Sequence, residues 1–220
     1  MFLKKNMSHK KAWFHNIITI VLLLNFFLGN AQELKSGDLI FQVEGKGDFS
    51  HAISSSTGLQ DSINFVHVGI IEVKGDTINV IEASPEKGVC ITPYNFFIER
   101  SPKINGKPGA VVKRIDFDFP VDSAIFNAKR YLGDGYDWWY LPDNGKIYCS
   151  ELVYESFYDN YGKRIFQGNP MNFRSPDGSM PEFWVKLYEK LGVDIPEGVI
   201  GTNPNDMSKS DFLREICRFF

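Results

Sequence analysis

The spacing of apolar and polar residues predicts a series of short strands in the first half of the chain. Five runs rich in Val, Ile and Phe have the length and composition of strands: residues 39–43, 65–73, 77–83, 89–91 and 110–115. Lys74-Gly75-Asp76 separates the second run from the third and is typical of a tight turn. These two strands are therefore expected to pair as an antiparallel hairpin.

Helical spacing predominates in the second half. Apolar residues three or four positions apart predict helices at residues 94–100, 118–132, 149–161 and 181–191. Pro93 precedes the first of these helices and Gly192 ends the last, as is common at helix termini. The helix at 149–161 is expected to bury one face, made of Leu152, Val153, Phe157 and Tyr161.

Two segments have no clear period. Residues 44–62 are rich in Gly and Ser and predict a loop, with at most a helical turn around Ala52-Ile53. The tail, residues 193–220, is punctuated by Pro, Gly and Asn and predicts a last short helix near residues 211–219. Because no repeat or linker divides residues 32–220, the pattern predicts a single α+β domain, with helices packed against a small antiparallel sheet.

The first 31 residues have the pattern of a secretory signal peptide. Four lysines precede an apolar run at residues 17–28, and small residues follow at Gly29-Asn30-Ala31. An uncleaved membrane anchor is the alternative, but the run is shorter than the roughly 20 residues that a spanning helix needs. We therefore expect cleavage and export to a periplasm or to the medium, with no membrane span left in the mature protein.

Charge excludes one class of partner. The mature chain would carry 20 basic residues against 27 acidic ones, a net charge of −7, and it has no basic stripe. Nucleic acid is therefore not an expected partner. A hydrophobic content of 43% is sufficient for a sizeable core.

Three cysteines, Cys90, Cys149 and Cys217, leave at least one free thiol in an exported protein. Their spacing does not match a zinc site, so no metal or other cofactor is expected. The sequence leaves open whether Cys90 and Cys217 form a disulfide.

Cys149 is the strongest candidate for chemistry. It lies where a polar loop ends and the helix at 149–161 begins, and a helix N-terminus favours a thiolate over a thiol. His67 lies on a predicted strand, and Glu82 lies on the next one. Cysteine, histidine and a carboxylate are the parts of an activated thiolate nucleophile. The alternating pattern puts His67 on the same strand face as Phe65, Gly69 and Ile71.

Each of these residues also has a purely structural interpretation. Cys149 is then a buried, inert cysteine, His67 a hydrogen-bonded core histidine and Glu82 an outward-facing strand residue. The mature chain has one other histidine, His51, in the Gly- and Ser-rich segment, so His67 is the better candidate for a base.

Two tyrosines are candidates for substrate binding. Tyr136 begins an aromatic loop that either lines a groove or fills the core, and Tyr148 precedes Cys149 and either contacts the reacting carbonyl or packs. The Cys149 backbone N–H is a candidate oxyanion donor, because the first amides of a helix have no partner within it.

The ordered motifs resemble the YiiX/YebB-like group of NlpC-type, circularly permuted papain-like cysteine hydrolases. The motifs that carry the resemblance are Gly37-Asp38, His67-Val68-Gly69, Glu82-Ala83, Tyr136-Asp137 and Tyr148-Cys149-Ser150-Glu151-Leu152-Val153. The histidine precedes the cysteine, the reverse of the order in papain itself. The resemblance implies a papain-like core, an antiparallel sheet or barrel with the cysteine helix packed against it. It also implies Cys149 as nucleophile, His67 as base and Glu82 as the residue that orients the histidine. His51 departs from the family's pattern and is kept as a bystander.

The implied reaction is hydrolysis of an amide in a cell-wall peptide or another small substrate, through an acyl-enzyme. Two alternatives remain open. One is a lipid acyl hydrolase or acyltransferase, similar to the lecithin:retinol acyltransferase branch. The other is a non-catalytic module that binds a small ligand. The sequence does not indicate an oligomeric state.

Overall fold

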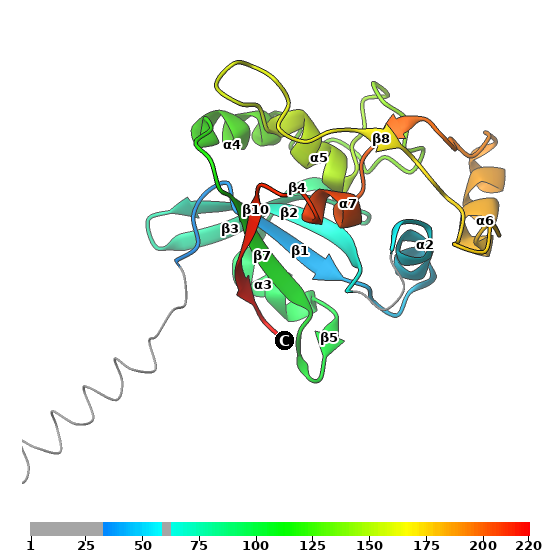
Figure 1. Cartoon of the computed structure of the whole chain (residues 1–220), viewed down its shortest axis with the longest axis horizontal. Coiled ribbons are helices and arrows are strands. Elements are labelled where there is room, and N and C mark those ends of the chain that lie inside the picture. The colour runs from blue at the N-terminus through cyan, green and yellow to red at the C-terminus, as the bar shows by residue number, and fades with distance from the viewer. Residues whose placement is uncertain (1–32, 59–62) are drawn as a thin grey trace, which may run out of the picture. The chain divides into compact units, whose positions relative to one another are not determined.

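A six-stranded antiparallel sheet is the centre of the computed structural model, which describes residues 33–58 and 63–220 (Figure 1). The predicted signal peptide and the end of the predicted loop at 44–62 lie outside the described residues. The strand order is β10-β7-β1-β2-β3-β4. The strands of this sheet are β1 (Leu39–Val43), β2 (Phe65–Lys74), β3 (Thr77–Ser84), β4 (Gly88–Pro93), β7 (Ala110–Ile115) and β10 (Leu213–Arg218).

Helices cover both faces of this sheet. α4 and α5 contribute to the larger apolar cluster, together with Phe41 and Ile70, whereas α3 contributes Phe97 to a smaller cluster on the opposite face. α2 and α6 pack against each other beside the sheet (Figure 1). The helices are α2 (Asp48–Thr57), α3 (Tyr94–Arg100), α4 (Val121–Arg130), α5 (Cys149–Ser156), α6 (Glu182–Leu191) and α7 (Pro204–Ser208). Two short ribbons complete the fold, β5 (Lys103–Ile104) with β6 (Lys107–Pro108) and β8 (Asn169–Pro170) with β9 (Ile200–Gly201).

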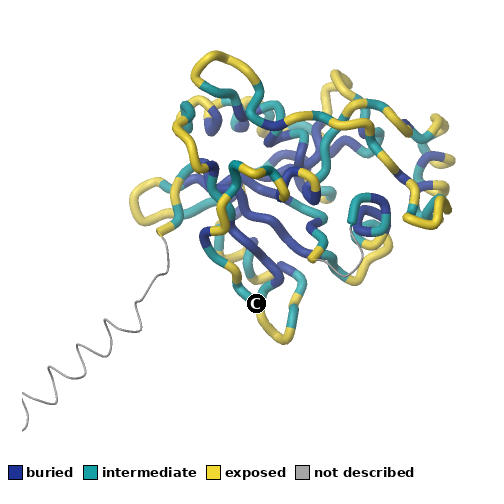
Figure 2. The backbone as a smooth tube through the Cα atoms, in the orientation of Figure 1, coloured by how far each residue is buried: buried dark blue, intermediate teal, exposed yellow. Residues whose placement is uncertain are grey.

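The sheet follows the sequence pattern closely. β1 is buried at every position, as expected for a strand that pairs with β2 on one side and β7 on the other (Figure 2). The predicted hairpin joins β2 to β3, and Gly75 at its turn has a φ of 54°, which glycine adopts at little cost. The predicted helix at 94–100 is α3, and Gly192 ends α6 in the left-handed conformation.

The predictions for two segments were wrong. The Gly- and Ser-rich segment contains α2, a ten-residue helix rather than a loop with a single turn. Its low intrinsic helix propensity is overcome by burial of Ala52 and Ile53 and by the bond from the Ser56 hydroxyl to the Phe173 carbonyl. The tail forms the strand β10 rather than a helix, because pairing with β7 satisfies its backbone and buries Ile216.

Two helices are shorter than predicted. α4 covers Val121–Arg130, and α5 ends at Ser156 because Phe157 takes an extended conformation. Leu152, Val153 and Phe157 are buried as predicted, but Tyr161 is 95% exposed and takes no part in the buried face.

A bulge in β2 corrects the predicted strand face. The register between β1 and β2 shifts between Gln42 and Val43, so strict alternation is lost near His67. Phe65 consequently packs in the larger cluster, whereas His67 stacks on Phe97 of the smaller one.

The positions of Cys90 and Cys217 exclude a disulfide between them. Cys90 lies on β4 and Cys217 on β10, at opposite edges, and both thiols are free. Among the described residues, no helix has both the length and the apolar character needed to cross a bilayer.

Candidate active site

Cys149 is the first residue of α5, and its side chain faces the protein interior. Tyr148 precedes it in an extended conformation, and a side-chain oxygen of Glu151 accepts a 3.3 Å hydrogen bond from the Tyr148 N–H. Cys149 is only 4% exposed, and α5 packs against β2 and β3 through Leu152 and Val153. The helix start is therefore held against the two strands that carry His67 and Glu82.

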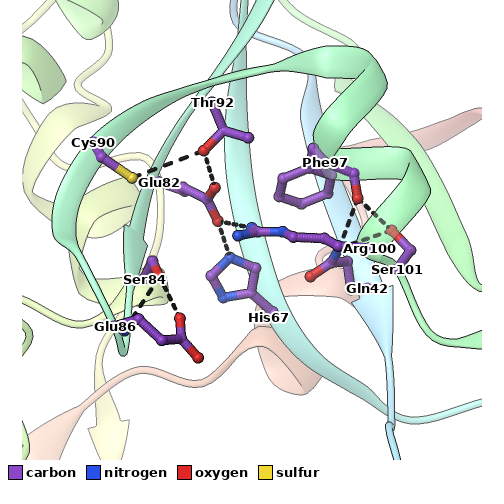
Figure 3. Close-up of polar contacts among 10 residues, drawn as sticks. All are labelled: Gln42, His67, Glu82, Ser84, Glu86, Cys90, Thr92, Phe97, Arg100 and Ser101. Carbon is purple, nitrogen blue, oxygen red and sulfur yellow. Dashed lines mark hydrogen bonds and ion pairs between the residues drawn. The ribbon is translucent and has the colours of Figure 1, made fainter.

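His67 connects Cys149 to Glu82. Its Nε2–H donates to the Glu82 carboxylate at 2.7 Å (Figure 3). On its other side the ring interacts with the Cys149 side chain, which contributes to its raised pKa. Because Nε2 is used by Glu82, Nδ1 is the ring nitrogen left for the thiol. Burial opposes charging of the ring, but the bonds to Cys149 and Glu82 outweigh it and raise the pKa of His67 to about 9. These contacts therefore favour the imidazolium form of the ring.

Glu82 is fully buried and has three polar partners. Besides His67, it accepts a 2.5 Å hydrogen bond from the Thr92 hydroxyl and forms an ion pair with Arg100 (Figure 3). Burial alone would raise the pKa of this carboxyl, but His67, Arg100 and Thr92 together lower it to about 2. A buried carboxylate is tolerated only with partners of this kind.

Three contributors to this arrangement were not predicted: Thr92, Phe97 and Arg100. The His67 ring and the Arg100 guanidinium both pack on Phe97, with ring centroids 5.9 Å apart and the guanidinium carbon 4.9 Å from the Phe97 centroid. The predicted helix at 94–100 does contain Phe97 and Arg100. What the sequence lacks is the fold of α3 over the sheet, which brings that helix to Glu82.

The sequence analysis also did not identify Gln42, whose side chain holds the C-terminal end of α3 in place. Its amide donates to the Ser101 hydroxyl at 2.7 Å and to the Phe97 carbonyl at 3.3 Å. Gln42 is the cross-strand partner of His67. Strand β1 therefore ties α3 to the position in the sheet where His67 lies.

The predicted binding tyrosines lie beside Cys149 in one pocket. The Tyr148 hydroxyl accepts a 3.1 Å hydrogen bond from the Thr202 N–H. The Tyr136 and Tyr140 hydroxyls are 3.3 Å apart and hydrogen-bonded to each other. Both interpretations of the aromatic loop are thus partly correct, because Tyr136 is buried and also lines the pocket.

His51 is not brought to this site. It bonds to Glu44 at 2.9 Å on the surface and lines a groove between α2 and α6 that contains none of the three candidate catalytic residues. In the described part of the chain, no group of three or more His, Cys, Asp or Glu side chains is arranged to hold a metal ion.

The arrangement supplies the groups needed for acyl transfer. It has a thiol at a helix start, an adjacent imidazolium and a carboxylate that stabilises that imidazolium. The backbone N–H of Cys149 belongs to the first turn of α5, where amides have no partner within the helix and can donate to an oxyanion.

Comparison with known proteins gives matching results. Residues 33–217 match the family model of the permuted papain-like amidases, YaeF/YiiX, C92 family. The chain is 30% identical over 185 residues to the uncharacterized protein YiiX of Escherichia coli K12, covering 82% of this chain and 85% of YiiX. It is also similar to the crystal structure of YiiX from Escherichia coli O157:H7, which is titled a metalloprotein. The TM-score is 0.67 and the identity 26%, over 84% of this chain and 97% of that one.

Proposed function

Because the chain belongs to the permuted papain-like amidases of the YaeF/YiiX C92 family, a family of cysteine hydrolases, we propose that Cys149, His67 and Glu82 are its catalytic triad. Membership in this family also favours a hydrolase over a non-catalytic binding module. The observation that carries the triad is the continuous set of contacts from Cys149 through His67 to Glu82, made by side chains from α5, β2 and β3.

The proposed reaction is hydrolysis of an amide through an acyl-enzyme. The Cys149 thiolate attacks the carbonyl carbon, and the carbonyl oxygen becomes an oxyanion that the Cys149 N–H stabilises. The intermediate collapses to a thioester as the His67 imidazolium gives its proton to the leaving amine. Neutral His67 then takes a proton from water, and the hydroxide formed adds to the thioester carbonyl. The C–S bond breaks, which releases the acid and restores the Cys149 thiolate beside the His67 imidazolium.

Glu82 acts on this cycle through His67. It keeps Nε2 protonated, so that Nδ1 faces the thiol, and its negative charge stabilises the imidazolium. Thr92 and Arg100 hold Glu82 ionised and fixed. Both are positioning residues in this proposal.

Export of the enzyme is part of the proposal and rests on the leader pattern in residues 1–31. An exported amidase has small peptides, cell-wall peptides among them, and acylated amines within reach. A lipid acyl hydrolase is the alternative. The apolar lining of the pocket beside Cys149 bears on this choice and is treated below.

Selective alkylation tests the triad without knowledge of the substrate. At pH 6 we expect iodoacetamide to modify Cys149 at least about tenfold faster than Cys90 or Cys217, whose thiol pKa values are both raised by burial. The His67→Ala variant should lose this excess. Peptide mass spectrometry gives the rate at each cysteine, and equal rates at all three in the wild type would refute the proposal.

Activity provides the second test. We expect Cys149→Ala to lower amide hydrolysis by several orders of magnitude, with an unchanged circular dichroism spectrum. Cys90→Ser is the matched control and should keep the wild-type rate. The triad would be wrong if Cys149→Ala retained full activity.

A further inference from the structure

We propose that the acyl half of the substrate is uncharged and short, with roughly three to five carbon atoms. This inference rests on the proposed hydrolysis at Cys149. It is drawn from the difference between two hollows that meet at the catalytic groups. One contains Cys149 and the start of α5, and the other contains His67 and Glu82. Ile53, Val66 and Tyr136 line both.

The chemistry decides which half of the substrate each hollow receives. The leaving amine must take its proton from His67, so it lies on the side of the histidine. The acyl carbon bonds to the sulfur, and its oxygen must reach the amide at the helix start. The acyl half therefore extends into the hollow that contains Cys149, which we call the acyl pocket.

No charged side chain lines the acyl pocket, all of whose lining residues are among the described ones. Its wall is mainly aromatic and aliphatic: Ile53, Val66, Tyr136, Tyr140, Met171, Phe173 and Trp184. The hollow beside His67 is different, because Glu86, Lys87 and Arg100 line it together with the catalytic pair.

Several polar side chains of the acyl pocket already have hydrogen-bond partners within the protein. The Ser56 hydroxyl donates to the Phe173 carbonyl and accepts from the Trp184 indole N–H. The Thr202 hydroxyl donates to Ser150, and the Asn203 side chain caps α7. A carboxylate or ammonium on the acyl group would be buried here without a counter-charge, which costs far more than burial of a methyl group.

Size sets the second limit. The cavity volume of the acyl pocket is about 50 Å³, and one water-sized group needs roughly 10–15 Å³ on this measure. The pocket therefore admits about three to five such groups. A butyryl or branched five-carbon acyl group fits this space. A γ-glutamyl group of cell-wall peptides fails on charge, and most of a long lipid chain would extend out of this pocket.

Activated esters test the acyl half with the leaving group held constant. The probes are the 4-nitrophenyl esters of butyric, octanoic and succinic acid, and the last is a four-carbon acyl group with one carboxylate. We expect kcat/KM for the butyrate to exceed that for the succinate about 100-fold and that for the octanoate about tenfold. Rates are corrected with Cys149→Ala, and the thioester on Cys149 is identified by mass spectrometry.

Position 171 allows a matched pair of variants. Met171 lines the acyl pocket and is only partly buried, so its substitution leaves the core in place. Met171→Lys adds a cation and should narrow the butyrate-to-succinate ratio about tenfold. Met171→Gln has a similar length without charge and should change the ratio less than about threefold.

The outcomes separate the two proposals. If the esters form a thioester on Cys149 but the succinate or the octanoate reacts as fast as the butyrate, the proposed preference for a short, uncharged acyl group is wrong. The proposed triad would be unaffected by that result. If no ester modifies Cys149 and the rates equal those of Cys149→Ala, the triad itself fails, and the inference fails with it. If Met171→Lys does not fold, the wild-type ester series still decides the question.

Discussion

Cys149 and Cys90 both lie close to the same carboxylate, but they are placed in opposite ways. Cys149 reaches Glu82 through the imidazolium of His67. Cys90 is the cross-strand partner of Glu82 on β4 and lies 3.8 Å from the Thr92 hydroxyl, with no base between it and Glu82 (Figure 3). The pKa of Cys90 is raised, mainly by burial and further by the charge of Glu82. The two cysteines therefore differ in whether a basic side chain lies between the thiol and the carboxylate, and the proposed mechanism needs that side chain.

Removal of the Glu82 charge should affect the two thiols in opposite directions. We expect Glu82→Gln to lower amide hydrolysis and the alkylation rate of Cys149 by about 100-fold to 1,000-fold, because the imidazolium loses its partner. Cys90 should be alkylated slightly faster, because its thiolate loses a nearby negative charge. Peptide mass spectrometry measures the alkylation rates of both cysteines in one experiment. Slower alkylation at both would contradict the proposed difference between them.

The ion pair of His67 and Glu82 also predicts that the stability of the fold depends on pH. The pKa of His67 rises from 6.5 to about 9 on folding, so the folded state holds the extra proton and stability falls as pH increases through this window. The pKa of Glu82 falls from 4.5 to about 2, so stability falls as pH decreases through that window.

The melting temperature should therefore be highest between these two windows. We expect His67→Ala to lose several degrees at pH 6 and much less at pH 10, where the wild type has already lost the imidazolium. Differential scanning calorimetry across pH 5–10 measures this. A constant difference over the whole range would contradict the assignment.

Substitution of Arg100 should reduce activity less than substitution of Glu82. It should lower the reactivity of both Cys149 and Cys90. Arg100→Gln leaves Glu82 bonded to His67 and Thr92, so we expect a three- to tenfold loss of hydrolysis. Alkylation of Cys90 should also slow slightly, because Arg100 lowers the pKa of that thiol. Arg100→Lys should recover part of the loss, whereas a substitution at exposed Lys107 should have no effect.

Glu151 gives the smallest expected effect. Burial, with added repulsion from nearby acids such as Asp137, raises its pKa to about 8, although the bond from the Tyr148 N–H opposes the shift. The folded state binds more protons than the unfolded one between pH 4.5 and 8, so ionisation of Glu151 lowers stability there. Glu151→Gln keeps an acceptor for Tyr148 and should raise the melting temperature by a few degrees at pH 8 but not at pH 4.5. An equal shift at both pH values would show that charge is not the cause.

Much of the sheet could be predicted because local pattern and pairing agree there. The strand at 39–43 has the predicted bounds, and the hairpin turn at Gly75 needs only local chemistry. β10 was predicted wrongly because its structure depends on pairing with β7, about a hundred residues earlier in the chain. α2 was missed because distant residues stabilise it, among them Phe173.

The same division applies to the site. Cys149, His67 and Glu82 could be chosen as candidates because each occurs in a local motif, and the structure brings the three side chains together. Arg100 and Thr92 were not found, because their relation to Glu82 depends on the packing of α3 and the register of β4. For Tyr148 the sequence left two roles open, and the bond of its hydroxyl with the Thr202 N–H in the tail is one that no local pattern indicates.

The chain order of the site has a consequence for synthesis of the protein. His67 and Glu82 lie on adjacent strands that are complete before Cys149 is added, and at about 5–20 residues per second the interval is several seconds. During that time the base and its carboxylate exist without a nucleophile. In the proposed mechanism the thiol gains its base only when α5 packs on strands that are already paired. We therefore expect a nascent chain with this order of residues to have no hydrolytic capacity until its last third has folded.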